Sequence, residues 1–94
     1  MDRQQVLNTI GDELQRQGAT RVAIFGSFAR GDDSPSSDID ILVAFRPAKS
    51  LLQLVKIEQD LSKRLDRKVD LLTPDAISPL LRPTIEKDLK VLWQ

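Results

Sequence analysis

The stretch GSFARGDDSPSSDIDILV, residues 26–43, decides the fold of this chain. A Gly-Ser pair precedes a loop, and the loop leads into a run in which acidic and apolar residues alternate. Successive side chains of a strand point to opposite faces, so Asp38 and Asp40 share one face and the apolar residues share the other. Two unit charges about 4 Å apart repel by roughly 4 kcal/mol at an effective dielectric near 20. Water or a cation must therefore neutralise this pair, and a divalent metal ion is the natural partner.

The composition limits both the size of the protein and its chemistry. With 94 residues, 40% of them apolar, residues 1–94 are expected to form one compact domain. The 14 basic and 14 acidic residues cancel, so direct nucleic-acid binding by bulk charge is not expected. The chain has no Cys, His or Tyr, which excludes Ser-His-Asp and Cys-His mechanisms. Carboxylates, hydroxyls and cations remain, so any catalysis should be metal-assisted.

The N-terminal sequence, MDRQQVLNTIGDEL, has no apolar stretch of signal-peptide length. No window approaches the roughly 18 apolar residues that a membrane span requires. We therefore predict a cytoplasmic protein with no membrane association.

Hydrophobic periodicity and turn formers predict the order of the elements. Asp2 is the expected cap of the first helix and Gly18 its stop, while Ser50 and Gln53 form a capping box for a later helix. We expect Pro79 and Pro83 to break the C-terminal part into short helical pieces. The predicted elements are a helix between residues 2 and 18, strands at 21–25 and 38–45 joined by a loop at 31–37, a helix at about 50–65, a strand at 69–72 and an edge strand at 91–93.

These elements predict an α/β (α+β) fold, a small mixed sheet of about four strands with helices mainly on one face. The helix at about 50–65 suits a parallel crossover between strands 38–45 and 69–72. The short connection between strands 21–25 and 38–45 allows those two to run antiparallel.

Asp70, on the strand at 69–72, is the third notable carboxylate. If this strand lies about 4.8 Å from strand 38–45, Asp70 meets Asp38 and Asp40. Three carboxylates supply hard oxygen ligands for one or two Mg²⁺ ions, and two ions about 4 Å apart would clamp the attacking and leaving oxygens of a phosphoryl-type displacement. We predict all three as metal ligands and catalytic residues. The alternative for Asp70 is a polar residue on the exposed face of an edge strand.

The Gly26-Ser27 pair stands at a strand end before an expected helical turn at 28–30. A helix N-terminus offers free backbone N–H groups to an anion, and a glycine lets phosphate oxygens approach closely. We predict that Gly26 and Ser27 hold the terminal phosphates of a nucleoside triphosphate. Arg30 is a further candidate phosphate contact, or else an ion-pair partner of a nearby aspartate. Ser37 is a candidate nucleotide contact, or else a local hydrogen-bonding residue.

Residues 26–43 resemble the nucleotidyltransferase motif of the polymerase-β-like superfamily: a Gly-Ser pair, ten residues, then Asp, any residue, Asp. Arg30-Gly31, Ser37, Asp70 and the short length make the whole chain similar to the minimal nucleotidyltransferases (MNT). The resemblance implies the palm-like fold of that superfamily and transfer of a nucleoside monophosphate, AMP from ATP, with release of pyrophosphate. It also implies a partner, a helical HEPN ribonuclease toxin that the MNT silences by adenylylating it, so that the pair forms a toxin–antitoxin system.

Two other functions are compatible with the sequence. The chain could be a non-catalytic antitoxin that neutralises its partner by occlusion and retains the acidic site only as a remnant. It could instead be the catalytic subunit of a small-molecule nucleotidyltransferase of the aminoglycoside type, although no segment is available to form a drug pocket. Substituting Asp38 and Asp40 distinguishes the two antitoxin hypotheses, because only the catalytic one requires these carboxylates.

Overall fold

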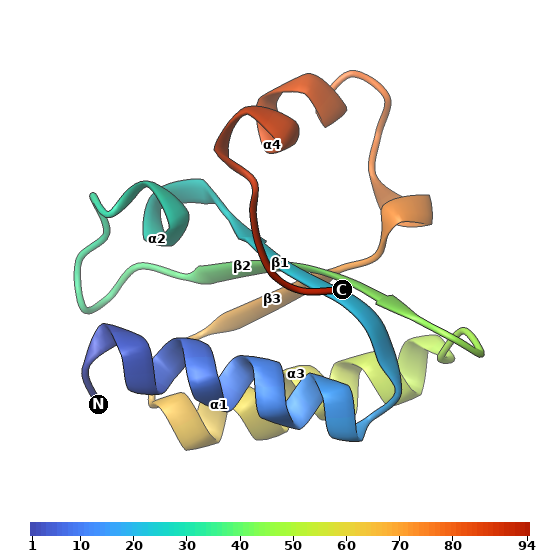
Figure 1. The fold of residues 1–94 in the computed structure, drawn as a ribbon, viewed down its shortest axis with the longest axis horizontal. Coiled ribbons are helices and arrows are strands. Elements are labelled where there is room, and N and C mark those ends of the chain that lie inside the picture. The colour runs from blue at the N-terminus through green and yellow to red at the C-terminus, as the bar shows by residue number, and fades with distance from the viewer.

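A computed structural model describes all of residues 1–94 and confirms the predicted mixed sheet with helices (Figure 1). The predicted order of helices and strands is also confirmed. The elements are α1 (Arg3–Arg16), β1 (Ala19–Phe25), α2 (Gly26–Arg30), β2 (Ile39–Phe45), α3 (Leu51–Leu65), β3 (Val69–Leu72), the short 3-10 helix η1 (Pro74–Ala76), α4 (Arg82–Asp88) and β4 (Lys90–Trp93).

The sheet has the strand order β3-β2-β1-β4. The strands β2 and β3 are parallel, and α3 forms the connection between them, as the crossover prediction required. The central strand β1 runs antiparallel to both of its neighbours, β2 and β4. The predicted C-terminal edge strand is therefore confirmed as β4, and β3 forms the opposite edge.

Both long helices begin at the residues that the sequence marks. The side chain of Asp2 accepts a hydrogen bond from the backbone N–H of Gln5 at 2.8 Å. In turn, the side-chain oxygen of Gln5 accepts one from the backbone N–H of Asp2. Ser50 and Gln53 form the same reciprocal pair at the start of α3. Such capping boxes satisfy N–H groups that have no partner inside the helix. The sequence therefore determines these two helix starts locally.

The two faces of the sheet are covered unequally. The long helices α1 and α3 lie against one face, whereas α4 lies on the other side of the sheet (Figure 1). Apolar residues of β2 point toward α1 and α3, and Ile39, Ile41 and Val43 are all fully buried in a cluster of 15 residues. A smaller cluster of 4 buried residues lies under η1 and α4. The prediction of helices mainly on one face holds for the long helices.

Some details differ from the sequence prediction. The strand β1 begins at Ala19, two residues earlier than expected, and β2 begins at Ile39, so Asp38 immediately precedes it. The C-terminal part does form short helical pieces, η1 and α4, with Pro79 between them. Pro83 lies in the first turn of α4, where its missing N–H has no intrahelical partner to lose. No helix in the structure has both the length and the apolar character needed to cross a membrane.

Candidate functional site

The sheet register brings two of the predicted carboxylates side by side. Asp40 of β2 is the direct partner of Asp70 of β3. Asp40 also lies opposite Phe25, the last residue of β1, so Gly26 follows directly beside it. Asp38 is two residues before Asp40 and stands just outside the strand. Adjacent strands and the period of two therefore gather three acidic residues and the Gly-Ser turn at one end of the sheet.

The pKa values of these carboxyl groups reflect their closeness. Partial burial raises the pKa of Asp40, and the charges of Asp70 and Asp38 raise it further. Partial burial likewise raises the pKa of Asp70, and Asp38 adds to this effect by its charge and by a hydrogen bond. Lys68 acts in the opposite direction on both. The negative charges of these three carboxylates therefore repel one another, and a bound cation would reduce this repulsion.

A lysine already contacts part of this acidic group. The Nζ of Lys68 lies 3.7 Å from a carboxylate oxygen of Asp38 and 3.9 Å from one of Asp70. With the side chains so placed, no three acidic residues are close enough together to hold one metal ion. The side chains of Asp38 and Asp70 are each 43% exposed, so they can rotate away from the ammonium without disturbing the core. The donor set of carboxylate oxygens suits Mg²⁺, and the role of the three residues as ligands stays a prediction.

Gly26 has a backbone conformation that favours glycine, and the missing side chain leaves room for the Asp40 carboxylate. Its φ is +76°, and a Cβ at this position would collide with the carboxylate of Asp40. The glycine thus lets α2 begin directly against the acidic group. The expected helical turn is present and starts at Gly26 itself, with Ser27 as its second residue. The chain therefore places the candidate phosphate-binding turn and the candidate metal ligands next to each other.

Arg30 and Ser37 make contacts within the protein. Arg30 forms an ion pair of 2.6 Å with Asp88 of α4 and one of 3.2 Å with Asp32. The ion-pair alternative for Arg30 therefore holds, although Asp88 was not an expected partner. The hydroxyl of Ser37 accepts a hydrogen bond from the backbone N–H of Ser34 at 2.9 Å. Ser37 therefore makes a local hydrogen bond, which was the second of its two predicted roles. The charge of Arg30 also lowers the pKa of Asp40, so this arginine acts on the acidic group without a direct bond to it.

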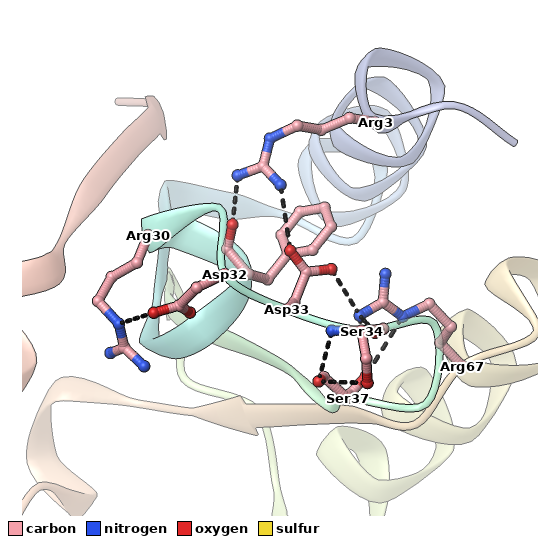
Figure 2. A network of polar contacts seen from close by, with 8 residues as sticks. Arg3, Arg30, Asp32, Asp33, Ser34, Ser37 and Arg67 are labelled. Atoms are coloured by element: carbon pink, nitrogen blue, oxygen red, sulfur yellow. Dashed lines mark hydrogen bonds and ion pairs between the residues drawn. The ribbon is translucent and has the colours of Figure 1, made fainter.

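Arg67 takes part in a network of polar contacts with the loop before β2 (Figure 2). This network was not predicted from the sequence. Asp33, in the loop that the turn formers predict, has a side chain only 14% exposed and forms an ion pair of 3.1 Å with Arg67. Arg3 of α1 pairs with the same carboxylate at 3.7 Å. The only signal in the sequence was the charged turn that contains Arg67, directly before β3. Charge alone does not reveal which of many aspartates and arginines pair.

Comparison with known proteins gives the family. A family model described as a nucleotidyltransferase domain matches residues 7–92. The chain is 47% identical over 72 residues to a predicted protein adenylyltransferase of Methanocaldococcus jannaschii, and the alignment covers 77% of each chain. The fold and the acidic site thus define a small α+β domain of the transferase class. The chain belongs to the nucleotidyltransferase domain family, as the motif at residues 26–43 predicted.

Solved structures show the same architecture. One chain of a toxin–antitoxin crystal structure with AMP-PNP superposes with a TM-score of 0.83 at 28% identity, covering 93% of this chain and 72% of that chain. One chain of a structure in which a tri-AMPylated Shewanella oneidensis HEPN toxin is bound to an MNT antitoxin gives a TM-score of 0.80 at 26% identity. That match covers 98% of this chain and 72% of the other. The similarity extends over the whole sheet and its helices.

Proposed function

We propose that this chain is a Mg²⁺-dependent protein adenylyltransferase that transfers AMP from ATP to a hydroxyl group of a HEPN toxin and so acts as its antitoxin. Three observations support this. The chain belongs to the nucleotidyltransferase family. A relative is named as a protein adenylyltransferase. Similar solved structures are toxin–antitoxin complexes, one with AMP-PNP and one with an AMPylated HEPN toxin.

Each site residue has a defined part in the proposed reaction. Asp38, Asp40 and Asp70 would hold Mg²⁺, which when bound neutralises phosphate charge and polarises the reacting phosphoryl group. The turn at Gly26 and Ser27 would bind the terminal phosphates through backbone N–H groups and the serine hydroxyl. The acceptor oxygen bonds to the α-phosphorus, the bond from that phosphorus to pyrophosphate breaks, and pyrophosphate leaves. With no His in the chain, either Asp70 would accept the hydroxyl proton or a bound metal ion would lower the barrier to losing it.

The pairing of Asp40 with Asp70 beside Gly26 is the observation that carries the proposal. Side-by-side carboxylates repel, and this repulsion opposes folding when no cation is bound. A protein that only occluded its partner would have no use for such a pair next to a glycine that makes room for it. The arrangement has a clear use in a site where a metal ion and phosphates meet.

The test is transfer of nucleotide to the HEPN protein that forms the toxin–antitoxin pair with this chain. The purified chain is incubated with that protein, Mg²⁺ and each of the four nucleoside triphosphates in turn, and the partner is weighed by mass spectrometry. We expect ATP to add the mass of one or more AMP groups, and EDTA to prevent the addition. No mass gain with any triphosphate would overturn the proposal.

Substitution of the acidic residues separates the enzyme from the occluding protein. The double variant Asp38→Ala/Asp40→Ala should lose transfer by at least about a hundredfold, since the several kcal/mol that a metal ion supplies correspond to tenfold per 1.36 kcal/mol. The control is Asp60→Ala, which removes an exposed carboxylate of α3. Toxin neutralisation in cells should fail with the double variant and persist with the control. Full neutralisation by the double variant would favour occlusion instead.

A further inference from the structure

Four residues from four parts of the chain form one polar cluster around an aromatic ring. They are Arg3 of α1, Phe28 of α2, Asp33 of the loop after α2, and Arg67 just before β3, and we call them the Arg67 cluster. Figure 2 shows the two arginines converging on Asp33 from different elements. The proposed function uses none of these residues, yet the cluster contacts α2, which begins at Gly26, and the loop that ends directly before Asp38.

Arg67 binds the loop that leads into the acidic strand. Its guanidinium donates to the carbonyl of Ser37 at 2.9 and 3.2 Å, and to the carbonyl of Ser34 at 3.1 Å. It also donates to the Asp33 carboxylate at 3.1 Å. Ser37 is the residue directly before Asp38. The bonds of Arg67 therefore fix the backbone at the point where the first candidate metal ligand begins.

Phe28 connects the same cluster to the candidate phosphate turn. The guanidinium carbon of Arg67 lies 5.1 Å from the centre of the Phe28 ring, and that of Arg3 lies 4.2 Å from it. Arg3 also donates to the Phe28 carbonyl. Phe28 itself is buried, two residues after Gly26. Guanidinium groups stack favourably on aromatic faces, so the two arginines hold α2 in place against the loop.

The start of β3, the strand that carries Asp70, is hydrogen-bonded to the start of β2. Asp70 follows Arg67 by three residues. Between them, the carbonyl of Lys68 accepts the backbone N–H of Ile39 at 2.9 Å. Arg67 and this bond thus join the start of β2 to the start of β3. The position of Asp70 relative to Asp38 depends on both.

We infer that Arg67 is a positioning residue, which through the carbonyl of Ser37 and the carboxylate of Asp33 sets the position of Asp38 relative to the register pair Asp40 and Asp70. This inference rests on the proposed function of the three carboxylates. Only arginine suits the task, because its planar fork can donate to several oxygens at once, whereas a lysine ammonium is a single point charge on a flexible stem. A fixed spacing matters because Mg²⁺ demands near-ideal octahedral geometry.

The test compares Arg67→Lys with Arg64→Lys. Arg64 is the matched control, because its ion pair of 2.8 Å with Glu13 joins α3 to α1 away from the acidic residues. For each variant we would measure kcat, the KM for ATP, the Mg²⁺ concentration that gives half the maximal rate, and the unfolding temperature with and without Mg²⁺ and ATP. We expect Arg67→Lys to lower kcat at least tenfold and to raise the required Mg²⁺ severalfold. Arg64→Lys should change neither.

The outcomes separate the inference from the proposed function. If Arg67→Lys unfolds more easily but keeps the wild-type kcat and Mg²⁺ requirement, Arg67 has only a structural role and the inference is overturned. If Arg67→Lys does not fold, Asp33→Asn, which weakens the same cluster while keeping the shape of the side chain, replaces it with the same expectations. If the wild type binds Mg²⁺ and ATP without transferring AMP, the proposed function fails, and the Mg²⁺-dependent shift in unfolding temperature decides the inference alone. A wild type that shows neither transfer nor binding overturns both.

Discussion

The sheet face against α1 and α3 buries 15 residues in one cluster, whereas the face beneath η1 and α4 buries 4. Asp40 and Leu42 alternate with Ile39, Ile41 and Val43 along β2, so they share the second face. The acidic group thus lies on the thinly covered face, at the end of the sheet where water and ions can reach it. Stability and the candidate chemistry are divided between the faces, because charged side chains without partners cannot be buried in a dense apolar core.

The largest expected effect comes from breaking the well-packed face. Leu61 is fully buried against the sheet, so Leu61→Ala should lower the free energy of unfolding by about 2–5 kcal/mol. Ile85 of α4 is 9% exposed and belongs to the small cluster, so Ile85→Ala should cost only roughly 1–2 kcal/mol. Denaturant unfolding of both variants gives the comparison. Equal losses would show that the two faces contribute equally to stability.

A second comparison isolates the contact between Gly26 and Asp40. Gly26 has a φ of +76° and Gly31 one of +82°, so an alanine at either position is strained by about 1–2 kcal/mol. Only the alanine at position 26 would also collide with the Asp40 carboxylate, because nothing lies within 4 Å of a Cβ at Gly31. Gly26→Ala should therefore displace the Asp40 carboxylate and abolish AMP transfer, while Gly31→Ala keeps transfer. Similar activities of the two variants would contradict the importance of this close approach.

The smallest expected effect concerns the charge on the thin face. The pKa of Asp40 is raised in the folded protein above its ordinary 3.8, so the charged carboxylate opposes folding at neutral pH. That opposition is present above the folded pKa and disappears as pH falls through it toward 3.8, where the folded state takes up the extra proton. Asp40→Asn should thus unfold at a slightly higher temperature than the wild type at pH 7. Thermal unfolding between pH 7 and 4 should show the difference shrinking; a constant difference would contradict it.

Much of this arrangement could be predicted because its causes are local. The capping residues Asp2 and Ser50 act on N–H groups three residues away, and the alternation along β2 assigns Asp40 to the face opposite Ile39 and Ile41. The pairing of Asp40 with Asp70 required one more step, the crossover that places β3 beside β2. That step could be predicted because a helix of suitable length separates two short apolar strands.

The contacts that could not be predicted join residues far apart in the chain. Arg67 pairs with Asp33 across 34 residues, and Arg30 pairs with Asp88 across 58. Nothing in the order of 14 basic and 14 acidic residues selects these partners. Each pair forms because strand register and helix packing bring the two side chains within reach of each other. In the unfolded chain, salt and water screen charges over about 10 Å, so electrostatic attraction does not select the partners before the fold forms.

By itself the sequence determined the helix starts, the alternating strand that carries the acidic residues, the Gly-Ser turn and the family. Only the tertiary structure decided that Arg67 would bind the backbone just before Asp38, that Arg30 would pair with α4, and that Lys68 would lie against Asp38 and Asp70. The physical reason is the distance along the chain over which each interaction acts. Caps, turns and strand alternation are set by neighbours along the chain, whereas the partner of a charged side chain is set by three-dimensional packing, which many different sequences of charges could satisfy.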